Sequence, residues 1–169
     1  MITENTSSEP TLTQSQVLTQ AATGESGLAD VVAVALVDPQ NPTRILAARR
    51  AYPAQLRGKW ELPGGKVRAG EDCRHALERE IKEELNCDIE CGDAVVNPQR
   101  EDGAWPILGG RRMFVWLGRP LTPVQCGPDH MEVAWREAAN YRELEWLAPN
   151  LPIVEYVFKQ ISGGVPTGG

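Results

Sequence analysis

Three carboxylates fall on one face of a predicted helix, in the segment EDCRHALEREIKEEL at residues 71–85. Because a helix turns by about 100° per residue, Glu80, Glu83 and Glu84 project together beside an apolar stripe. The stripe consists of Leu77, Ile81 and Leu85. Like charges at these spacings repel by about 0.2–0.5 kcal/mol per pair, whereas carboxylate oxygens are preferred ligands of Mg²⁺ and Mn²⁺. The cluster therefore predicts a divalent-cation site or, alternatively, a surface helix whose charges are screened or paired with neighbouring bases.

The stretch WELPGGK, residues 60–66, precedes this helix and has the pattern of a strand that is cut short. Pro63 cannot continue the hydrogen bonding of a strand. Gly64 and Gly65 lack side chains, so the backbone can approach a metal ion or a phosphate closely, and the Gly64 carbonyl is a candidate metal ligand. Lys66 adds a positive charge. The junction predicts the front half of a phosphate-handling site.

The spacing of these residues resembles the Nudix box, G-x5-E-x7-R-E-U-x-E-E-x-G-U, in which U is a bulky apolar residue. The matching positions are Gly65, Glu71, Arg79, Glu80, Ile81, Glu83 and Glu84. Asn86 stands where the motif has its last glycine, and Asn is the next-best residue for the left-handed position after a helix. Cys87 fills the final apolar position. The segments ARR, KWELPGGKV and LAPNLPIVEY extend the resemblance to the MutT-type branch, over roughly residues 30–160.

This resemblance implies an α+β protein with the Nudix fold, an α/β/α sandwich in which a mixed β-sheet lies between helices. It also implies hydrolysis of a nucleoside triphosphate to the monophosphate and pyrophosphate, with Mg²⁺ as the cofactor and Mn²⁺ as a substitute. The implied metal ligands are Gly64, Glu80, Glu83 and Glu84. Glu80 is also the candidate general base, and Arg79 orients the carboxylates. Glu71 supports the loop together with Gly65.

The resemblance implies one more acidic ligand, six residues before a tryptophan. That count from Trp135 leads to Asp129. Aspartate is shorter than the glutamate that is more common there, and Glu132 is a rival for the role. Arg50 and Lys66 are the expected contacts of the substrate's phosphates.

Asn150, in the segment APN, is the candidate residue for recognition of the base. An amide offers a donor and an acceptor, so it can pair with a purine edge that offers both. This favours 8-oxo-dGTP, and hence sanitation of the nucleotide pool, over CTP or dCTP, because cytosine-preferring relatives often carry Asp there. Alternatively, Asn150 caps the closing helix. Four aromatic residues are candidates to stack on a base or to fill the core: Tyr52, Trp60, Trp105 and Phe114.

The chain as a whole predicts one domain between two tails. Residues 1–27 are polar and are expected to be disordered, 28–162 form the Nudix domain, and 163–169 are flexible. The expected strands are DVVAVALVD, RILAARR, the segment ending at Leu62, CDIECGDAVV, RRMFVWLG and HMEVAWRE. LPIVEYVFKQI is expected to be an amphipathic closing helix.

Composition and charge exclude several classes of protein. The net charge is −6, so a nucleic-acid polymer is not an expected partner, although the basic segment 44–68 suits either a polyanionic substrate or a solvated face. The longest apolar run, 31–37, is too short to span a membrane, and the start lacks a basic leader, which predicts a cytoplasmic protein. The four cysteines lack metal-site spacing and are expected to be reduced. Protein partners are not indicated, and a non-catalytic nucleotide-binding module is the remaining alternative.

Overall fold

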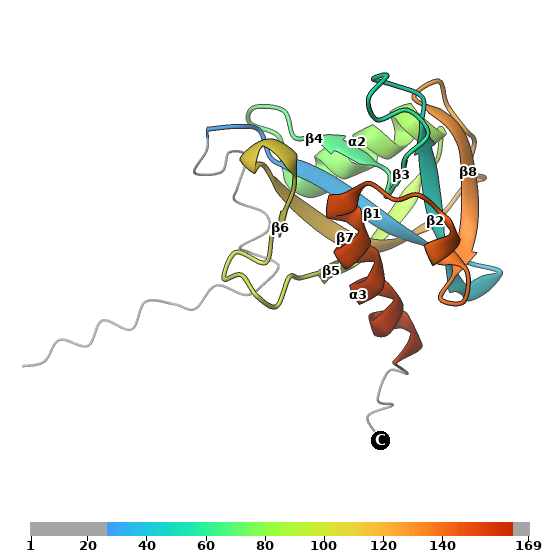
Figure 1. Cartoon of the computed structure of the whole chain (residues 1–169). Helices are drawn as coiled ribbons and strands as arrows, with labels where there is room; N and C mark the ends of the chain where they lie inside the picture. The colour runs from blue at the N-terminus through green and yellow to red at the C-terminus, as the bar shows by residue number, and fades with distance from the viewer. Residues whose placement is uncertain (1–26, 164–169) are drawn as a thin grey trace, which may run out of the picture.

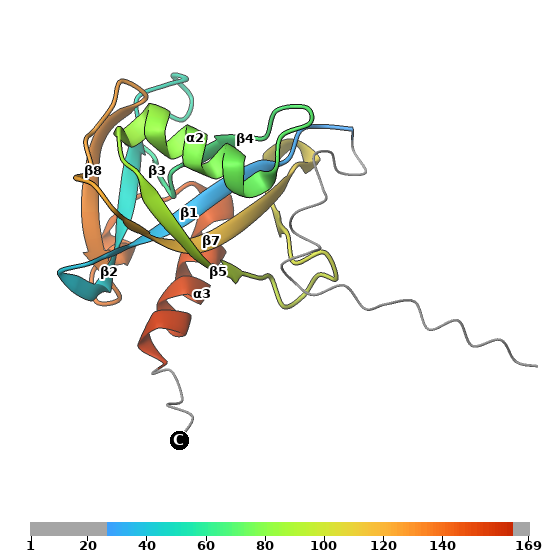
Figure 2. The ribbon, with the colours of Figure 1, turned by 180° about the vertical axis from the view of Figure 1, so that it is seen from behind.

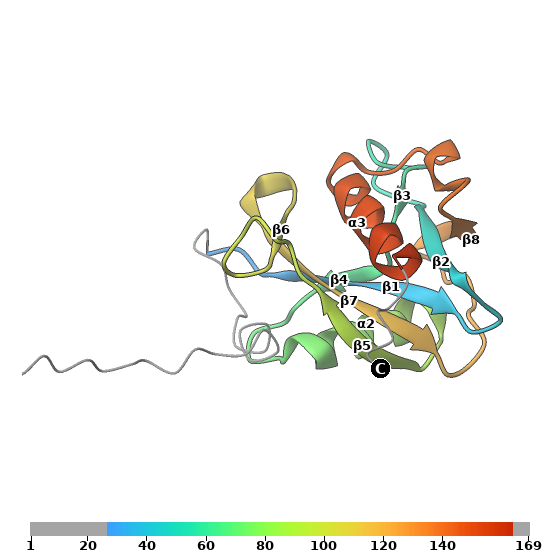
Figure 3. The same ribbon diagram turned by 90° about the horizontal axis from the view of Figure 1, so that it is seen from below.

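The computed structural model describes residues 27–163, so the predicted tails, 1–27 and 163–169, lie outside the described residues except for Gly27 and Gly163. Within that range a β-sheet lies between two helices, α2 (Cys73–Leu85) and α3 (Leu151–Ser162), as Figure 1 and Figure 3 show. The strands are β1 Val31–Asp38, β2 Asn41–Arg50, β3 Trp60–Glu61, β4 Gly64–Lys66, β5 Ile89–Val95, β6 Trp105–Pro106, β7 Arg112–Pro120 and β8 His130–Glu137. Short 3₁₀ turns lie at Leu108–Gly110, Tyr141–Glu143 and Ala148–Asn150.

The sheet is mixed. Its strand order is β3-β2-β1-β7-β5, with β4 paired to β1, β6 to β7 and β8 to β2. Strands β1 and β7 are parallel, and the other pairs are antiparallel. The predicted α+β architecture, with a mixed sheet between helices, is confirmed.

Strand β1 shows why its sequence is a continuous apolar run. The core on the α2 side contains Val32, Val34, Leu36, Leu77, Ile81 and Leu85. The core on the α3 side contains Ala33, Ala35, Ile153, Val154 and Val157. Figure 2 shows α2 lying across one face of the sheet, with α3 behind it. A strand covered on both faces needs apolar side chains throughout, and each fully buried Val, Leu or Ile contributes about 1.5–3 kcal/mol.

Helix α2 has well-defined ends. It begins at Cys73 rather than at the predicted Glu71, because Asp72 is the N-cap and accepts hydrogen bonds from the amides of Arg74 and His75. Asn86 adopts the left-handed conformation at the other end (φ 45°, ψ 42°), and its amide donates to the Lys82 carbonyl. Asparagine therefore replaces the motif's last glycine without loss of the turn, as the sequence predicted.

After β3 the chain turns back and forms β4, antiparallel to β1, which the sequence did not predict. This short strand contacts α2, so the glycine-rich junction lies directly above the helix that carries the carboxylates. None of the four cysteines forms a disulfide within residues 27–163. No helix within residues 27–163 is long and apolar enough to cross a membrane.

Candidate active site

Arg79 binds several acidic residues of the site at once and holds them in place. Its Nε and Nη2 atoms donate to the two carboxylate oxygens of Glu71, both at 2.8 Å. Its Nη1 atom donates to Glu80 Oε1 at 2.9 Å, and Nη2 also donates to the Lys66 carbonyl at 3.1 Å. The bidentate bond from Arg79 lowers the pKa of Glu71 to about 2. One guanidinium thus joins the junction, the helix and a carboxylate of the site.

Gly64 and Gly65 both stand where a side chain would not fit. Gly64 lies against another backbone segment, whereas Gly65 lies against a carboxylate side chain. A Cβ atom at Gly64 would lie 1.9 Å from the backbone oxygen of Val32 in β1. A Cβ atom at Gly65 would lie 2.3 Å from the carboxyl carbon of Glu80. The first glycine therefore allows β4 to pair with β1, and the second leaves room for a carboxylate against bare backbone.

This difference predicts that alanine acts differently at the two positions. We expect Gly64→Ala to destabilise the fold by about 3 kcal/mol or more, because two backbone segments must separate. We expect Gly65→Ala to keep a near-normal melting temperature, because a flexible side chain can move, but to lower kcat about 10- to 100-fold by displacing Glu80. Thermal melts and steady-state rates check both. Equal losses of stability in the two variants would contradict this assignment.

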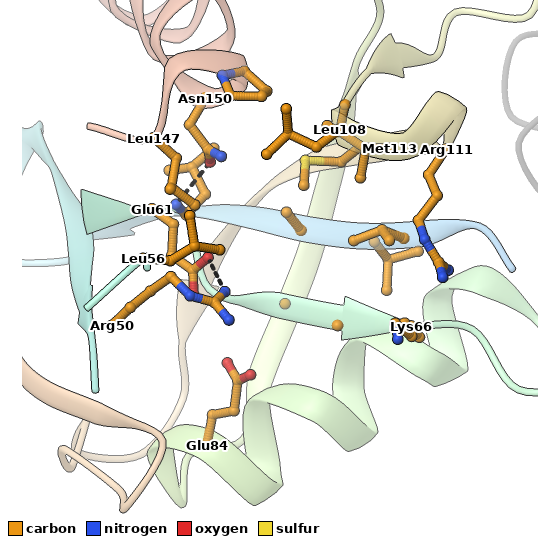
Figure 4. Close-up of a pocket in the computed structure, with 18 residues that line it drawn as sticks. Arg50, Leu56, Glu61, Lys66, Glu84, Leu108, Arg111, Met113, Leu147 and Asn150 are labelled. Carbon is orange, nitrogen blue, oxygen red and sulfur yellow. Dashed lines mark hydrogen bonds and ion pairs between the residues drawn. The ribbon is translucent and has the colours of Figure 1, made fainter. Parts of the chain in front are cut away.

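Glu84 is a buried carboxylate without a compensating charge. Its residue is 9% exposed, and among residues 27–163 its Oε2 atom has no hydrogen-bond partner. Burial, together with the charges of Glu61, Glu80 and Asp129, raises the pKa of Glu84 to about 9, against one backbone hydrogen bond from Gly64. Figure 4 shows this carboxylate pointing from α2 toward β4 and the pocket beyond it. An unpaired acid of this kind is costly unless a cation binds beside it.

The loop that carries Asp129 is attached to the end of α2. The Gly127 amide donates to the Glu84 carbonyl at 3.0 Å, and a Cβ at Gly127 would lie 2.3 Å from that oxygen. Asp129 itself accepts a hydrogen bond from the Tyr52 hydroxyl. Its rival Glu132 instead forms an ion pair with Arg49 at 2.9 Å. Asp129 therefore lies close enough to act electrostatically on Glu84, whereas Glu132 is paired with Arg49.

The acidic cluster fits a divalent cation by its chemistry. In the described part of the chain, no three acidic, histidine or cysteine side chains already converge on one point as they stand. Glu80 is held by Arg79, and Glu83 makes only long ion pairs, 3.5 Å to Arg79 and 3.7 Å to Arg68. The Glu83 side chain is 51% exposed, so it is free to turn. Excess negative charge and an orphaned oxygen at Glu84 are what a bound cation would satisfy.

A pocket of about 400 Å³ opens beside this cluster. Its lining includes Arg50, Glu61, Leu62, Gly64, Gly65, Lys66, Glu84, Leu108, Arg111, Met113, Leu147 and Asn150, and the labelled side chains are drawn in Figure 4. The volume lies in the range of small-molecule sites. The pocket thus brings the predicted phosphate and metal residues Arg50, Lys66, Gly64 and Glu84 together with Asn150 in one lining.

Asn150 is not used as a helix cap. It is buried, and its Oδ1 atom accepts a hydrogen bond from the Leu62 amide at 3.0 Å, whereas no side-chain bond caps α3. The alternative interpretation from the sequence, an N-cap, is therefore wrong in its hydrogen bonding. Because a backbone N–H can only donate, the oxygen of the amide is fixed toward Leu62, which leaves Nδ2 as the donor available to a ligand in the pocket.

Glu61 is a residue of the pocket that the sequence analysis missed. Its carboxylate accepts from Arg50 Nη1 at 2.8 Å and lies 3.1 Å from Nε2 of the buried His130. A charged residue between the buried Trp60 and Leu62 was the available signal. Arg111 and Leu108 also line the pocket, and no spacing in the sequence indicated them. Arg50 therefore reaches the pocket already paired with an acid.

The four aromatic candidates do not line this pocket. Trp60 and Phe114 are buried in the core, and Trp105 is buried with its Nε1 atom bonded to the Val95 carbonyl. Tyr52 is 55% exposed and directs its hydroxyl at Asp129. Any stacking on a base must come from other groups, such as Arg111 or the apolar side chains of the lining.

Comparison with known proteins identifies the family. A family model described as the NUDIX domain matches residues 27–156. The chain belongs to the Nudix family. As a Nudix hydrolase it is an enzyme of phosphorus-containing acid anhydrides, a family that generally uses divalent metal ions. The predicted resemblance is thereby confirmed.

Two relatives of this Nudix protein have informative names. A Mycobacterium tuberculosis protein, to which its name ascribes 8-oxo-dGTP diphosphatase activity, is 38% identical over 106 residues, covering 61% of this chain and 71% of the relative. The CTP pyrophosphohydrolase of Escherichia coli is 38% identical over 118 residues, covering 66% and 80%. The solution structure of the E. coli ORF135 protein has a TM-score of 0.61 and 26% identity, over 82% of this chain and 93% of that one. The relatives thus divide between the two substrate classes that the sequence left open.

Proposed function

We propose that this Nudix enzyme hydrolyses nucleoside triphosphates to the monophosphate and pyrophosphate in a Mg²⁺-dependent reaction, and that 8-oxo-dGTP is its preferred substrate. The observation that carries the proposal is the buried carboxylate of Glu84, without a partner for Oε2 among the described residues, at the edge of the pocket that also contains Asn150. The role would be to remove an oxidised nucleotide before it is incorporated into DNA.

The acidic residues of this site suit the binding of Mg²⁺ or Mn²⁺. We assign the ligand role to Glu80, Glu83 and Glu84, with Asp129 and the Gly64 carbonyl as further candidates. When present, Mg²⁺ neutralises the negative charge of the phosphates and increases the acidity of water. Asp129 is preferred to Glu132 because its charge acts on Glu84, whereas Glu132 is paired with Arg49.

The protein's own groups supply the rest of the reaction. Glu80 accepts a proton from the attacking water, since Arg79 binds its Oε1 atom and its other oxygen remains available. As the water oxygen bonds to phosphorus, the anhydride bond breaks and pyrophosphate leaves. Arg50 and Lys66, which line the same pocket, place positive charge beside the phosphates. Arg79 acts by fixing Glu80 and does not need to contact the substrate.

The orientation of the Asn150 amide supports the choice of base. Its oxygen is held by Leu62, so the pocket receives the Nδ2 donor. A donor matches the O6 keto oxygen that guanine and oxidised guanine carry, whereas cytosine carries its amino group at the equivalent edge position and would present a second donor there. Hydrolysis of CTP or dCTP is the second candidate, because the E. coli relative at 38% identity is named for that activity.

A substrate panel tests the proposal, with chromatographic separation of all phosphorylated products and, for the triphosphates, detection of pyrophosphate. The panel contains 8-oxo-dGTP, dGTP, dCTP, CTP, ADP-ribose and diadenosine polyphosphates, each with Mg²⁺, with Mn²⁺ and with a chelator. We expect the highest kcat/KM for 8-oxo-dGTP and no activity with the chelator. Preference for ADP-ribose would overturn the triphosphate assignment. Tight nucleotide binding without hydrolysis of any substrate would identify a non-catalytic binding module instead.

Exchange of the amide for a carboxylate should redirect the base preference. In Asn150→Asp the new carboxylate still accepts from the Leu62 amide, so the fold is retained, but the donor to the base is lost. We expect kcat/KM for 8-oxo-dGTP to fall about 10- to 100-fold, and the ratio of dCTP to 8-oxo-dGTP hydrolysis to rise.

Asn140→Asp is a matched control, because Asn140 Oδ1 also accepts from a backbone amide, that of Glu137, and lies outside the pocket lining. An unchanged ratio of the two substrates in Asn150→Asp would remove Asn150 from base recognition.

A further inference from the structure

The turn that carries Asp129 makes a second attachment, to the loop that follows β2. The Ala51 amide donates to the Asp129 carbonyl at 3.2 Å. The Tyr52 hydroxyl donates to Asp129 Oδ1 at 2.5 Å. These residues are 77 positions apart in the sequence, so the contact is a product of the fold. A charge-assisted bond between a phenol and a carboxylate is among the stronger hydrogen bonds in proteins.

Tyr52 has no packing role that would explain its identity. Its side chain is 55% exposed, it does not belong to either core, and it does not line the pocket. Its hydroxyl lies among the acids of the site, because it donates to Asp129; this hydrogen bond is the main reason that the pKa of Tyr52 is raised, and the charges of Asp129 and Glu84 raise it further. Among the described contacts of Tyr52, the hydrogen bond to Asp129 is therefore the one that can explain a tyrosine at this position.

The turn is held on its opposite side by the end of α2. The Gln125 amide donates to the Leu85 carbonyl at 2.9 Å, and the Gly127 amide donates to the Glu84 carbonyl. These bonds fix the backbone of the turn relative to the acidic cluster, but they leave the Asp129 side chain to rotate. The Tyr52 hydroxyl is the contact that fixes the side chain.

We propose that Tyr52 is a positioning residue for the metal site, whose hydroxyl orients the Asp129 carboxylate toward Glu84 so that the second oxygen can bind a cation. The proposal rests on the function proposed above, in which Asp129 is a ligand. An aspartate reaches one methylene less far than a glutamate, so its productive rotamer must be selected more strictly. Outer hydrogen-bond partners of metal ligands typically change metal affinity or activity by about 10- to 100-fold.

Direct measurement of metal binding tests this role in the full chain. Mn²⁺ is titrated by electron paramagnetic resonance into the wild type, Tyr52→Phe, Asp129→Asn and the double variant. We expect Tyr52→Phe to weaken Mn²⁺ binding about 10-fold, with an unchanged melting temperature in chelator, because the hydroxyl is the only group removed. In the Asp129→Asn background the same change should have no further effect.

Kinetics give a second readout that a purely structural role would not change. The Mg²⁺ concentration for half-maximal rate should rise about 10-fold in Tyr52→Phe, while the rate at saturating Mg²⁺ returns to within about twofold of the wild type. Tyr156→Phe is the control, because Tyr156 packs with its ring tilted against Trp105 on the other face of the sheet, outside the pocket lining. In Asp129→Glu, with its longer reach, the effect of Tyr52→Phe should shrink.

Each outcome separates this proposal from the function on which it rests. If Tyr52→Phe binds Mn²⁺ as tightly as the wild type while Asp129→Asn binds it weakly, the positioning role is overturned and Asp129 remains a ligand. If Asp129→Asn leaves Mn²⁺ affinity unchanged, the ligand role of Asp129 and the positioning role of Tyr52 are both overturned. Hydrolysis of triphosphates by the wild type would in that case still support the proposed function. If the wild type hydrolyses no triphosphate, the proposed function fails, whatever the Mn²⁺ titration shows.

Discussion

Glu84→Gln is expected to reduce hydrolysis severely and at the same time to stabilise the metal-free protein. The loss of activity follows from the assigned ligand role, since glutamine is a weak ligand for Mg²⁺ and the charge facing the phosphates is lost. We expect kcat/KM to fall by about 1,000-fold, equivalent to roughly 4 kcal/mol of transition-state stabilisation. Steady-state rates at saturating Mg²⁺ measure this part of the prediction.

The gain in stability follows from the burial of the same group. The pKa of Glu84 is raised from its ordinary value of 4.5 to about 9, so the folded state retains a proton that the unfolded state releases. Stability conferred on the metal-free wild type by this group is therefore present below about pH 4.5 and is lost as pH rises toward 9. Glutamine carries no such charge, so the variant should be more stable by about 2 kcal/mol near neutral pH.

Thermal melts in chelator across this pH range test the sign. The difference between Glu84→Gln and the wild type should be small near pH 4.5 and should grow as the pH approaches 9. Saturating Mg²⁺ should reverse the order, because only the wild type gains stability from the ion. Glu78→Gln, an exposed glutamate on the same helix, is the control and should change neither property. If Glu84→Gln were less stable than the wild type in chelator at every pH, the claim that the buried Glu84 destabilises the metal-free protein would be wrong.

Several features of this chain were predictable from local sequence patterns. The helix, its αL end at Asn86 and the two-faced burial of β1 follow from local periodicity and capping, which short stretches encode. The clustering of like charges on one face of α2 was also visible in the sequence, and the family resemblance implied that Arg79 orients these carboxylates. The structure shows that Arg79 binds Glu71 and Glu80 at once, which turns a repulsive cluster into an ordered network.

Contacts between distant strands were beyond the reach of the sequence. Glu61 meets His130 because β2 pairs with both β3 and β8, a register that no local pattern specifies. Asn150 was mistaken for a possible cap because its position before α3 is ordinary for one, whereas its partner is Leu62, 88 positions away. Residues whose role depends on tertiary pairing therefore appear only once the sheet is assembled.

Arg79→Lys is expected to destabilise the fold although it keeps the charge of the site. Lysine cannot reproduce the planar fork that binds Glu71 through two bonds and also reaches Glu80 and the Lys66 carbonyl. With two half-buried carboxylates left poorly paired, we expect a loss of about 2–3 kcal/mol at pH 7, measured by urea denaturation. We expect kcat to fall about 100-fold, because Glu80 loses the group that fixes it.

The pH dependence of that loss distinguishes a specific ion pair from general damage to the helix. Because Arg79 lowers the pKa of Glu71 from 4.5 to about 2, the pair stabilises the wild type fully above 4.5, and this contribution disappears as pH falls toward 2. The difference in unfolding free energy between wild type and Arg79→Lys should therefore shrink over this range. Arg74→Lys, on the exposed side of the same helix, should show little difference at any pH. If the difference in unfolding free energy between wild type and Arg79→Lys stayed constant from neutral to acidic pH, the ionised Glu71 would not be the partner of Arg79. The contacts that order the acidic face of α2 would then be those of Arg79 with Glu80 and Glu83 alone.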